Sequence, residues 1–276
     1  MNIIKRIIDS YDTTNIYLVK DLIKNPKGVV AIVHGLAEYC DRYEHLAKSL
    51  TEEGYAVYRF DLRGHGKSGS VKGWVEDYNF YIKDLDVVVD IAKKDYSQKP
   101  IFILGHSMGG FITAVYGIRA SEKIKGIILS AAALESPKEA KGLSRLMISI
   151  GSKICPKLKI KNNLGKLISK DKKLVEKYNN DPLVLKKITI KLYYEFLIRG
   201  IDWLTNNRDK FTVPCLMLHG EEDKIINHQV SLNFEKEIRS KDKKSILYSG
   251  LYHEIFNEEE KEIVIKDVKK WLNNKI

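Results

Sequence analysis

The chain has 276 residues, which is enough for one large hydrophobic core or for one core with an inserted subdomain. Hydrophobic residues make up 44% of the chain and charged residues 30%, which is ordinary for a globular protein and argues against long disorder. The formal net charge of +11 comes from scattered lysines in short clusters such as Lys93-Lys94, which indicates solvated faces and no nucleic-acid partner.

Three cysteines, Cys40, Cys155 and Cys215, occur without C-x-x-C spacing. They suggest neither a zinc site nor a disulfide framework, and we expect no metal and no cofactor. The low count is typical of a reducing compartment. Residues 1–14 lack the apolar core of a signal peptide, and no apolar run approaches the roughly 18 residues of a membrane span. The sequence therefore predicts a soluble, cytoplasmic protein.

Apolar runs that suit strands alternate with amphipathic stretches that suit helices along most of the chain. The first two strands are separated by polar turn residues and suit an antiparallel edge hairpin. The later strands are uninterrupted apolar runs, as expected of strands buried on both faces. Strands are expected at 2–8, 14–19, 29–33, 56–60, 101–104, 126–131, 213–218 and 245–248, and helices at 42–53, 77–95, 108–120, 229–239 and 258–272.

This alternation indicates the α/β class, with a mostly parallel eight-stranded sheet, right-handed crossovers and helices on both faces. The alternation breaks at residues 134–207, where no convincing buried strand appears and amphipathic helices are predicted. We interpret this segment as an inserted helical cap, or lid. The expected organisation is therefore a core in two parts, residues 1–133 and 208–276, with the cap between them.

The segment after the fifth strand reads Gly105-His106-Ser107-Met108-Gly109. Four apolar residues precede it and a helix-like apolar pattern follows it, which predicts a strand, a sharp turn and a helix. The turn would hold Ser107 in a strained backbone conformation that needs small residues at positions 105 and 109. This conformation presents the serine hydroxyl over the end of the sheet, as a nucleophile requires.

A serine hydroxyl needs a general base, usually an imidazole, and the imidazole needs a carboxylate that orients it. In folds of this kind the order along the chain is Ser, then Asp or Glu, then His, each just beyond a strand end. Asp223 and His253 follow that order, so the predicted catalytic triad is Ser107, Asp223 and His253. Glu221 and Glu222 are alternatives to Asp223, set aside because a shift by one residue re-aims a turn side chain.

Three other histidines lie near this constellation in the sequence. His219 ends the strand before Asp223 and is expected to be structural, and His228 begins a surface helix. His106 is expected to pack or hydrogen-bond under the turn, because its side chain points away from that of its neighbour Ser107. None of the three is expected to act as the base.

The oxyanion that develops during acyl transfer needs two preorganised N–H donors. One is expected to be the backbone amide of Met108, at the N-terminus of a helix whose dipole favours negative charge. The second should come from the loop after the third strand, His34-Gly35-Leu36, and we choose the amide of Leu36. The side chains of His34 and Glu38 are expected to hold this loop rather than react.

These segments together resemble the α/β-hydrolase superfamily, and within it the monoacylglycerol lipase and lysophospholipase branch, also called serine aminopeptidase S33-like hydrolases. The resemblance covers nearly the whole chain outside residues 135–179, and its most specific part is the His-Gly-x-x-Glu stretch with Arg42-Tyr43. It implies hydrolysis of a monoacylglycerol, a lysophospholipid or a related carboxylic ester through an acyl-enzyme, without a cofactor. The matching segments are 34–38, 42–43, 61–68, 105–110, 180–182, 213–214, 219–223 and 252–254.

The cap would choose the acyl chain, and it matches the family least. Between Ser144 and Lys161, apolar residues recur at helical spacing beside lysines. One interpretation is an amphipathic lid that contacts a membrane surface transiently, with lysines toward anionic headgroups. The other, which we favour, is a helix that buries its apolar side over the active site. The residues expected to line the substrate site are His34, Gly35, His106, Leu143, Met147 and Ile150.

The main prediction is a serine hydrolase whose partner is a small-molecule lipid ester; the oligomeric state is left open. Within enzymes, the alternatives are a general carboxylesterase for short acyl esters, or a thioesterase or acyltransferase with the same triad. A peptidase would need an acidic or polar pocket for a free amino terminus, and the sequence does not locate one. A silent binding protein on a hydrolase fold is the non-enzyme alternative, and the intact Ser, Asp and His argue against it.

Overall fold

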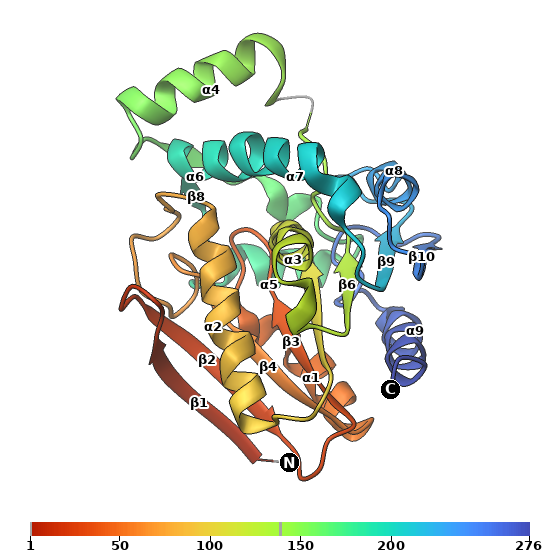
Figure 1. The fold of residues 1–276 in the computed structure, drawn as a ribbon. Coiled ribbons are helices and arrows are strands. Elements are labelled where there is room, and N and C mark those ends of the chain that lie inside the picture. The colour runs from red at the N-terminus through yellow and green to blue at the C-terminus, as the bar shows by residue number, and fades with distance from the viewer. Residues whose placement is uncertain (1, 138–139) are drawn as a thin grey trace.

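The computed structural model describes residues 2–137 and 140–276, and it contains an eight-stranded sheet in the order β1-β2-β4-β3-β5-β6-β9-β10 (Figure 1). β2 is antiparallel to both of its neighbours, and every pair from β4 onward is parallel. The α/β class and the mostly parallel sheet are therefore confirmed. The strands are β1 Asn2–Asp9, β2 Asn15–Leu22, β3 Gly28–Val33, β4 Tyr55–Phe60, β5 Ile101–His106, β6 Gly126–Ser130, β9 Cys215–Gly220 and β10 Lys243–Tyr248.

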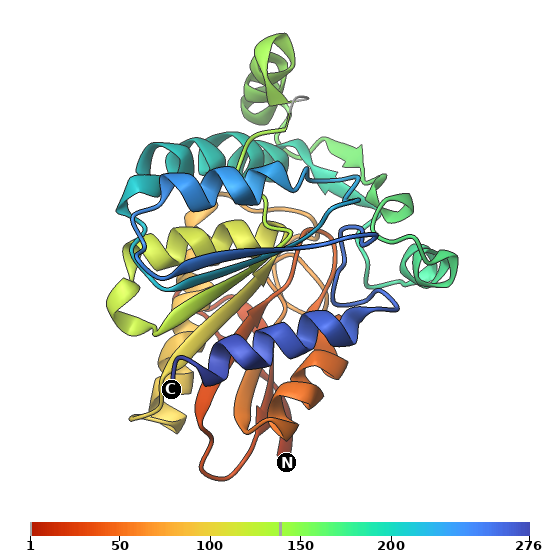
Figure 2. The same ribbon diagram turned by 90° about the vertical axis from the view of Figure 1, so that its right-hand side faces the viewer.

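Helices cover both faces of the sheet (Figure 2). The strands are apolar on both sides, so alternate residues of β3 enter two different clusters: Val29 and Val33 pack on one face, and Val30 and Ile32 on the other. The first face is covered by α2 Asn79–Asp95, α3 Met108–Arg119 and α8 Gln229–Glu237, and the second by α1 Glu44–Glu52 and α9 Lys261–Asn273.

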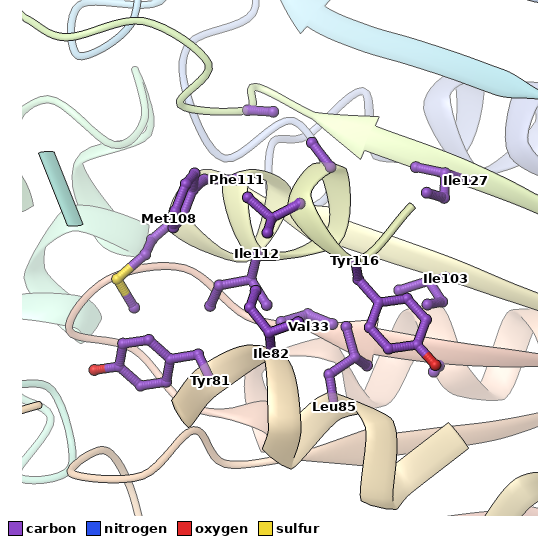
Figure 3. Packing of buried hydrophobic residues seen from close by; sticks show 14 of the residues in the cluster. Val33, Tyr81, Ile82, Leu85, Ile103, Met108, Phe111, Ile112, Tyr116 and Ile127 are labelled. Carbon is purple, nitrogen blue, oxygen red and sulfur yellow. The ribbon is translucent and has the colours of Figure 1, made fainter. Parts of the chain in front are cut away.

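α3 is buried over most of its length, which explains why its sequence is apolar on nearly every side. Figure 3 shows Met108, Ile112 and Tyr116 along the side of α3 that faces Ile82 and Leu85 of α2. This packing fixes the first turn of α3, and with it the backbone amide of Met108, against the sheet.

Several predicted elements differ from the observed ones only at their ends. The helix expected from Arg42 begins at Glu44, because Cys40–Tyr43 form a 3₁₀ turn that precedes α1. The second strand extends to Leu22 and pairs with β1 along eight residues. The last helix begins at Lys261, three residues later than expected.

The segment between β6 and β9 lies beyond the carboxyl ends of the parallel strands (Figures 1 and 2). The sequence suggested that this segment is helical throughout. It is not, because β7 and β8 form a two-stranded antiparallel sheet. Each strand has three residues, too few for an alternating pattern to be recognised in the sequence. The elements are α4 Gly142–Ile154, β7 Lys159–Lys161, a 3₁₀ turn Leu164–Lys166, α5 Lys172–Asn180, β8 Lys187–Thr189, α6 Ile190–Tyr194, a π-helical turn Glu195–Gly200, α7 Ile201–Asn207 and a 3₁₀ turn Arg208–Lys210.

Every helix within residues 2–137 and 140–276 is too short or too polar to cross a lipid bilayer. Over the same residues, no three side chains of His, Cys, Asp or Glu gather where they could hold a metal ion. All three cysteines are unpaired; Cys40 and Cys215 are buried and Cys155 is exposed.

Candidate active site

Ser107 stands between β5 and α3 with φ 52° and ψ −116°, a backbone conformation that side-chain-bearing residues rarely adopt. The close approach around it needs glycine: a Cβ on Gly105 would clash with the Gly109 carbonyl, and one on Gly109 would clash with the Val33 carbonyl. The Ser107 amide donates to the Ser130 carbonyl oxygen at 3.0 Å, which ties the turn to β6. The strained turn expected from the sequence is therefore present.

His253 lies in the loop after β10, and its Nδ1 is 2.7 Å from Oδ2 of Asp223. A carboxylate can only accept a hydrogen bond, so Nδ1 carries the proton and Nε2 keeps a lone pair for another proton. Burial alone would lower the pKa of His253, but the adjoining Asp223 carboxylate more than offsets burial and raises it above its usual value. The arrangement produces a neutral imidazole that accepts a proton readily.

Asp223 is held in the turn after β9 by a set of donors that fixes both carboxylate oxygens. Oδ1 accepts the backbone amides of Ile225 and Ile226 at 2.7 and 3.0 Å. Oδ2 accepts a second imidazole, Nε2 of His219, at 3.0 Å, in addition to His253. Burial opposes ionisation, but the two histidines keep the pKa of Asp223 far below its usual value. His219 also contacts Oγ of Ser231 at 2.8 Å, in keeping with a structural role.

Ser107 and His253 line one cavity of about 20 Å³, enough for about one water molecule. Asp223, behind His253, is not part of the lining, and Met108 is not part of it either. Of the residues expected in the substrate site, Gly35 and His106 line this cavity and His34 does not. The full lining is Gly35, Leu36, Glu38, His106, Ser107, Leu164, Ile168, Tyr178, Ile225, His253 and Glu254.

The loop after β3 approaches Ser107 closely, since a Cβ placed on Gly35 would lie 3.1 Å from the Ser107 Cβ. His34 holds the loop with both ring nitrogens. Its Nδ1 donates to the Gly35 carbonyl at 2.8 Å, and its Nε2 accepts the Leu62 amide at 2.9 Å. Glu38 also holds this loop, because its Oε1 accepts the Gly35 amide at 2.5 Å. Both side chains thus fix the loop that carries Leu36, as expected.

His106 follows the strand into the turn and is buried beside the base. Its ring centroid is 4.7 Å from that of His253, and its Nδ1 is 3.2 Å from Oγ of Ser130. Burial lowers the pKa of His106 to about 3, so this imidazole is neutral near pH 7. It contributes a fixed, uncharged wall to the cavity.

Leu143, Met147 and Ile150 do not line the cavity that contains Ser107. Their side chains on α4 are 72%, 64% and 49% exposed, so the favoured expectation that this helix buries its apolar side over the active site is wrong. α4 contacts α6 instead, at Gly151 on the flank of the helix, where an added Cβ would meet Ile190. The helix is amphipathic, as the sequence indicated, but its apolar side faces outward.

Sequence reasoning assigned no role to five residues of this site. Glu254 and Ile225 follow His253 and Asp223 by one and two positions, so their place in the same two loops could have indicated them. The other three, Leu164, Ile168 and Tyr178, come from the segment between β6 and β9, where no motif pointed to the cavity.

The chain matches known proteins over most of its length. The family described as serine aminopeptidase, S33, matches residues 24–260. A monoacylglycerol lipase of Mycolicibacterium smegmatis is 32% identical over 251 residues, covering 90% of this chain and 89% of that protein. A phospholipase of Bacillus subtilis is 30% identical over 244 residues, covering 87% of this chain and 93% of that protein.

Solved structures of lipases also match the chain over most of its length. The monoacylglycerol lipase of Paleococcus ferrophilus superposes with a TM-score of 0.85 at 30% identity, covering 95% of this chain and 99% of that one. A monoglyceride lipase of Saccharomyces cerevisiae, solved with a substrate analogue, reaches a TM-score of 0.87 at 26% identity, with coverage of 98% and 94%. The chain therefore belongs to the serine aminopeptidase S33 family of α/β-hydrolases.

Proposed function

We propose that the chain is a serine hydrolase that cleaves lipid-type carboxylic esters, such as a monoacylglycerol or a lysophospholipid, through an acyl-enzyme. One observation carries the proposal: Ser107 and His253 line the same small cavity, and His253 is held from behind by Asp223 at 2.7 Å. A strained serine, an oriented imidazole and a buried carboxylate are the groups that this chemistry needs.

The proposed reaction uses these groups in turn. Ser107 attacks the ester carbonyl and His253 Nε2 takes its proton, while Asp223 stabilises the imidazolium. The amides of Leu36 and Met108 hold the oxyanion; Met108 is the first residue of α3, so its N–H has no carbonyl one turn earlier to bond. His253 returns the proton to the leaving alcohol, and then activates the water that cleaves the acyl-enzyme.

The lipid substrate is supported by the relatives, which include enzymes named monoacylglycerol lipase and phospholipase. A cavity of about 20 Å³ does not hold an acyl chain, so entry requires a wider cavity. Leu164, Ile168 and Tyr178 are the apolar and aromatic walls that would have to separate. We therefore propose that residues 134–207 act as a movable cap on a core formed by 1–133 and 208–276.

The same cap is the proposed site of transient contact with a lipid surface. The outward apolar side of α4 continues to Ile154 and Leu158, which are 74% and 57% exposed, and exposed lysines 153 and 157 accompany it. Apolar side chains beside cations suit an anionic lipid interface. The cytoplasmic location stays a prediction of the sequence.

The test is hydrolysis of a panel of monoacylglycerols, lysophospholipids and p-nitrophenyl esters of graded length by the wild type and by Ser107→Ala. We expect the wild type to prefer long acyl chains and Ser107→Ala to lose at least about 10³-fold in turnover with its fold intact. Ser240→Ala, at a buried serine that does not line the cavity, is the matched control and should match the wild type.

Two outcomes would contradict the proposal. Turnover retained by purified Ser107→Ala would reject the mechanism. A wild type that prefers acyl groups of two to four carbons would replace the lipid substrate with a short ester, the alternative that the small cavity favours.

A further inference from the structure

Arg42 is a buried cation that joins two acidic side chains of the cavity wall. It lies in the 3₁₀ turn before α1, and its side chain is 7% exposed. Its Nε donates to Oε2 of Glu38 at 3.2 Å, and its terminal nitrogen donates to Oε2 of Glu254. Glu38 and Glu254 both line the cavity that contains Ser107, so one guanidinium connects two of its walls.

Each carboxylate that Arg42 binds is attached to a loop with a proposed chemical role. Glu38 accepts the Gly35 amide at 2.5 Å and the Tyr43 hydroxyl at 2.8 Å, and so fixes the residue before Leu36. Glu254 follows His253 directly in the chain, and its Oε2 also accepts Nδ2 of Asn257 at 3.0 Å. Arg42 therefore spans from the oxyanion loop to the loop of the base.

A third element of the structure contacts the same guanidinium. The Arg42 group stacks on the ring of Tyr178 at 4.8 Å from its centroid, and Tyr178 belongs to α5 in the segment between β6 and β9. Tyr178 is buried and lines the cavity. Tyr178, in the proposed cap, therefore contacts the guanidinium that joins the two loops.

The charges of Arg42, Glu38 and Glu254 oppose separation of the two loops. Burial disfavours all three ions, yet the two carboxylates hold the pKa of Arg42 above its usual value, so the guanidinium stays charged. Burial and the neighbouring Glu38 raise the pKa of Glu254, which the cation offsets only in part. A buried carboxylate separated from its cation is costly, so displacement of either loop away from Arg42 is opposed.

We propose that Arg42 is a positioning residue for hydrolysis, which holds the loop of Leu36 and the loop of His253 in one geometry through Glu38 and Glu254. The proposal rests on the proposed function of the site and assigns Arg42 no contact with the reacting atoms. Its loss would let the oxyanion donor and the base drift apart, which lowers the rate of the chemical steps more than binding.

The chain offers a matched control in a second buried arginine. The Arg63 side chain is 4% exposed, bridges two carboxylates, Asp12 and Asp84, and stacks on the ring of Phe80 at 4.9 Å. Neither Arg63 nor these partners line the cavity with Ser107. Replacing Arg42 or Arg63 by methionine removes the same kind of interaction, but only Arg42 bonds to carboxylates that line the cavity.

The experiment measures kcat and KM for p-nitrophenyl butyrate, with the urea midpoint as a readout of folding. We expect Arg42→Met to lower kcat about 10- to 100-fold with KM within about threefold, and Arg63→Met to keep kcat within about twofold despite a similar loss in midpoint. Glu254→Ala should resemble Arg42→Met. Glu254→Gln retains an oxygen acceptor for Arg42 and Asn257 but not the charge, and should lose clearly less kcat than Glu254→Ala.

Equal losses of kcat in Arg42→Met and Arg63→Met would overturn the inference, because stability alone would then explain both. A loss in Glu254→Gln as large as that in Glu254→Ala would also overturn it, and this pair decides the matter if Arg42→Met does not fold. A wild type that neither turns over esters nor reacts with fluorophosphonates would overturn the proposed function and this inference together, whereas the first two outcomes leave the proposed function standing.

Discussion

The side chains at the strand ends around Ser107 are buried and hydrogen-bonded, whereas many side chains of the helix α4 are exposed to solvent. At the strand ends, Asp223 has four donors on two oxygens, and His253 is 4% exposed. On α4, Leu143 and Ile154 are more than 70% exposed, and Arg145 forms an ion pair with Asp202 in which both side chains are themselves exposed.

The difference separates the two parts of the proposed function. Donors and charges that are fixed before the substrate arrives lower the barrier of the chemical step, so rigidity at the strand ends is useful. The proposed lipid contact needs apolar side chains that stay outside the core, as Leu143 and Ile154 of α4 do. Changes at the strand ends should therefore act on rate, and changes on α4 on lipid contact.

The largest effect is expected from Asp223→Asn. The amide preserves the shape of the side chain, but it does not enforce the tautomer in which His253 Nε2 is free, so turnover of p-nitrophenyl butyrate should fall by about 10⁴-fold. Asp209→Asn, an exposed aspartate paired with Arg239, is the control and should be indistinguishable from the wild type. Turnover within tenfold of the wild type in Asp223→Asn would remove Asp223 from the triad.

Gly35→Ala tests the close approach of the two loops. The added Cβ would meet Oε1 of Glu38 at 2.8 Å and the Ser107 Cβ at 3.1 Å, and displacement of either should lower kcat/KM about 10- to 100-fold. Gly142→Ala, at the start of α4, meets no atom within 4 Å and has only its φ of 56° to strain it. Short-ester turnover by Gly142→Ala should stay within about twofold, and equal losses in both variants would contradict the comparison.

The outward side of α4 should control attachment to lipid without affecting chemistry. We expect Met147→Ser/Ile154→Ser to bind anionic vesicles about tenfold more weakly, because two exposed apolar side chains no longer enter the interface. Its turnover of p-nitrophenyl butyrate should match the wild type.

Ile263→Ser replaces a side chain of α9 that is 60% exposed, and serves as the matched control for vesicle binding. It should bind vesicles like the wild type. Unchanged binding by the α4 variant, or an equal loss in the control, would reject α4 as the lipid contact.

The pH dependence should report His253 and not His106. The base must be neutral to act, and Asp223 raises the pKa of His253, so kcat/KM should fall with decreasing pH around a midpoint above the roughly 6.5 of free histidine. Burial lowers the pKa of His106 to about 3, so His106→Asn should leave that midpoint in place, within about 0.3 units, whatever it does to the rate. A midpoint that shifts in His106→Asn would mean that the fall in kcat/KM at low pH reports His106 and not His253.

The smallest effect is expected where α4 meets α7. Arg145→Ala removes an ion pair whose partners are 38% and 42% exposed, so the free energy of unfolding in urea should fall by less than about 1 kcal/mol. Phe111→Ala, in the core against Phe196, should lower it by about 3–5 kcal/mol for comparison. A loss of several kcal/mol in Arg145→Ala would mean that α4 is anchored more firmly than its exposure indicates.

The meeting of Ser107, Asp223 and His253 could be predicted because parallel strands bring their carboxyl ends to one edge, so residues after three strands lie together there regardless of their separation in sequence. The side of α4 could not be predicted for an equally physical reason. A period of 3.6 residues indicates that a helix has an apolar side, but not which surface covers that side. Arg42 appeared in the sequence only as part of a motif, since its two carboxylate partners are 4 and 212 residues away.

The backbone of Ser107 bears on the stability of the chain as well as on its chemistry. Its φ of 52° costs on the order of 1–3 kcal/mol, and its side chain makes no capping bond to α3 that glycine would lose. Glycine there would cost only about 0.4–1 kcal/mol through its freedom in the unfolded chain. A chain that did not use the hydroxyl would gain stability by discarding it, so the strain at Ser107 is a cost that the proposed mechanism accounts for.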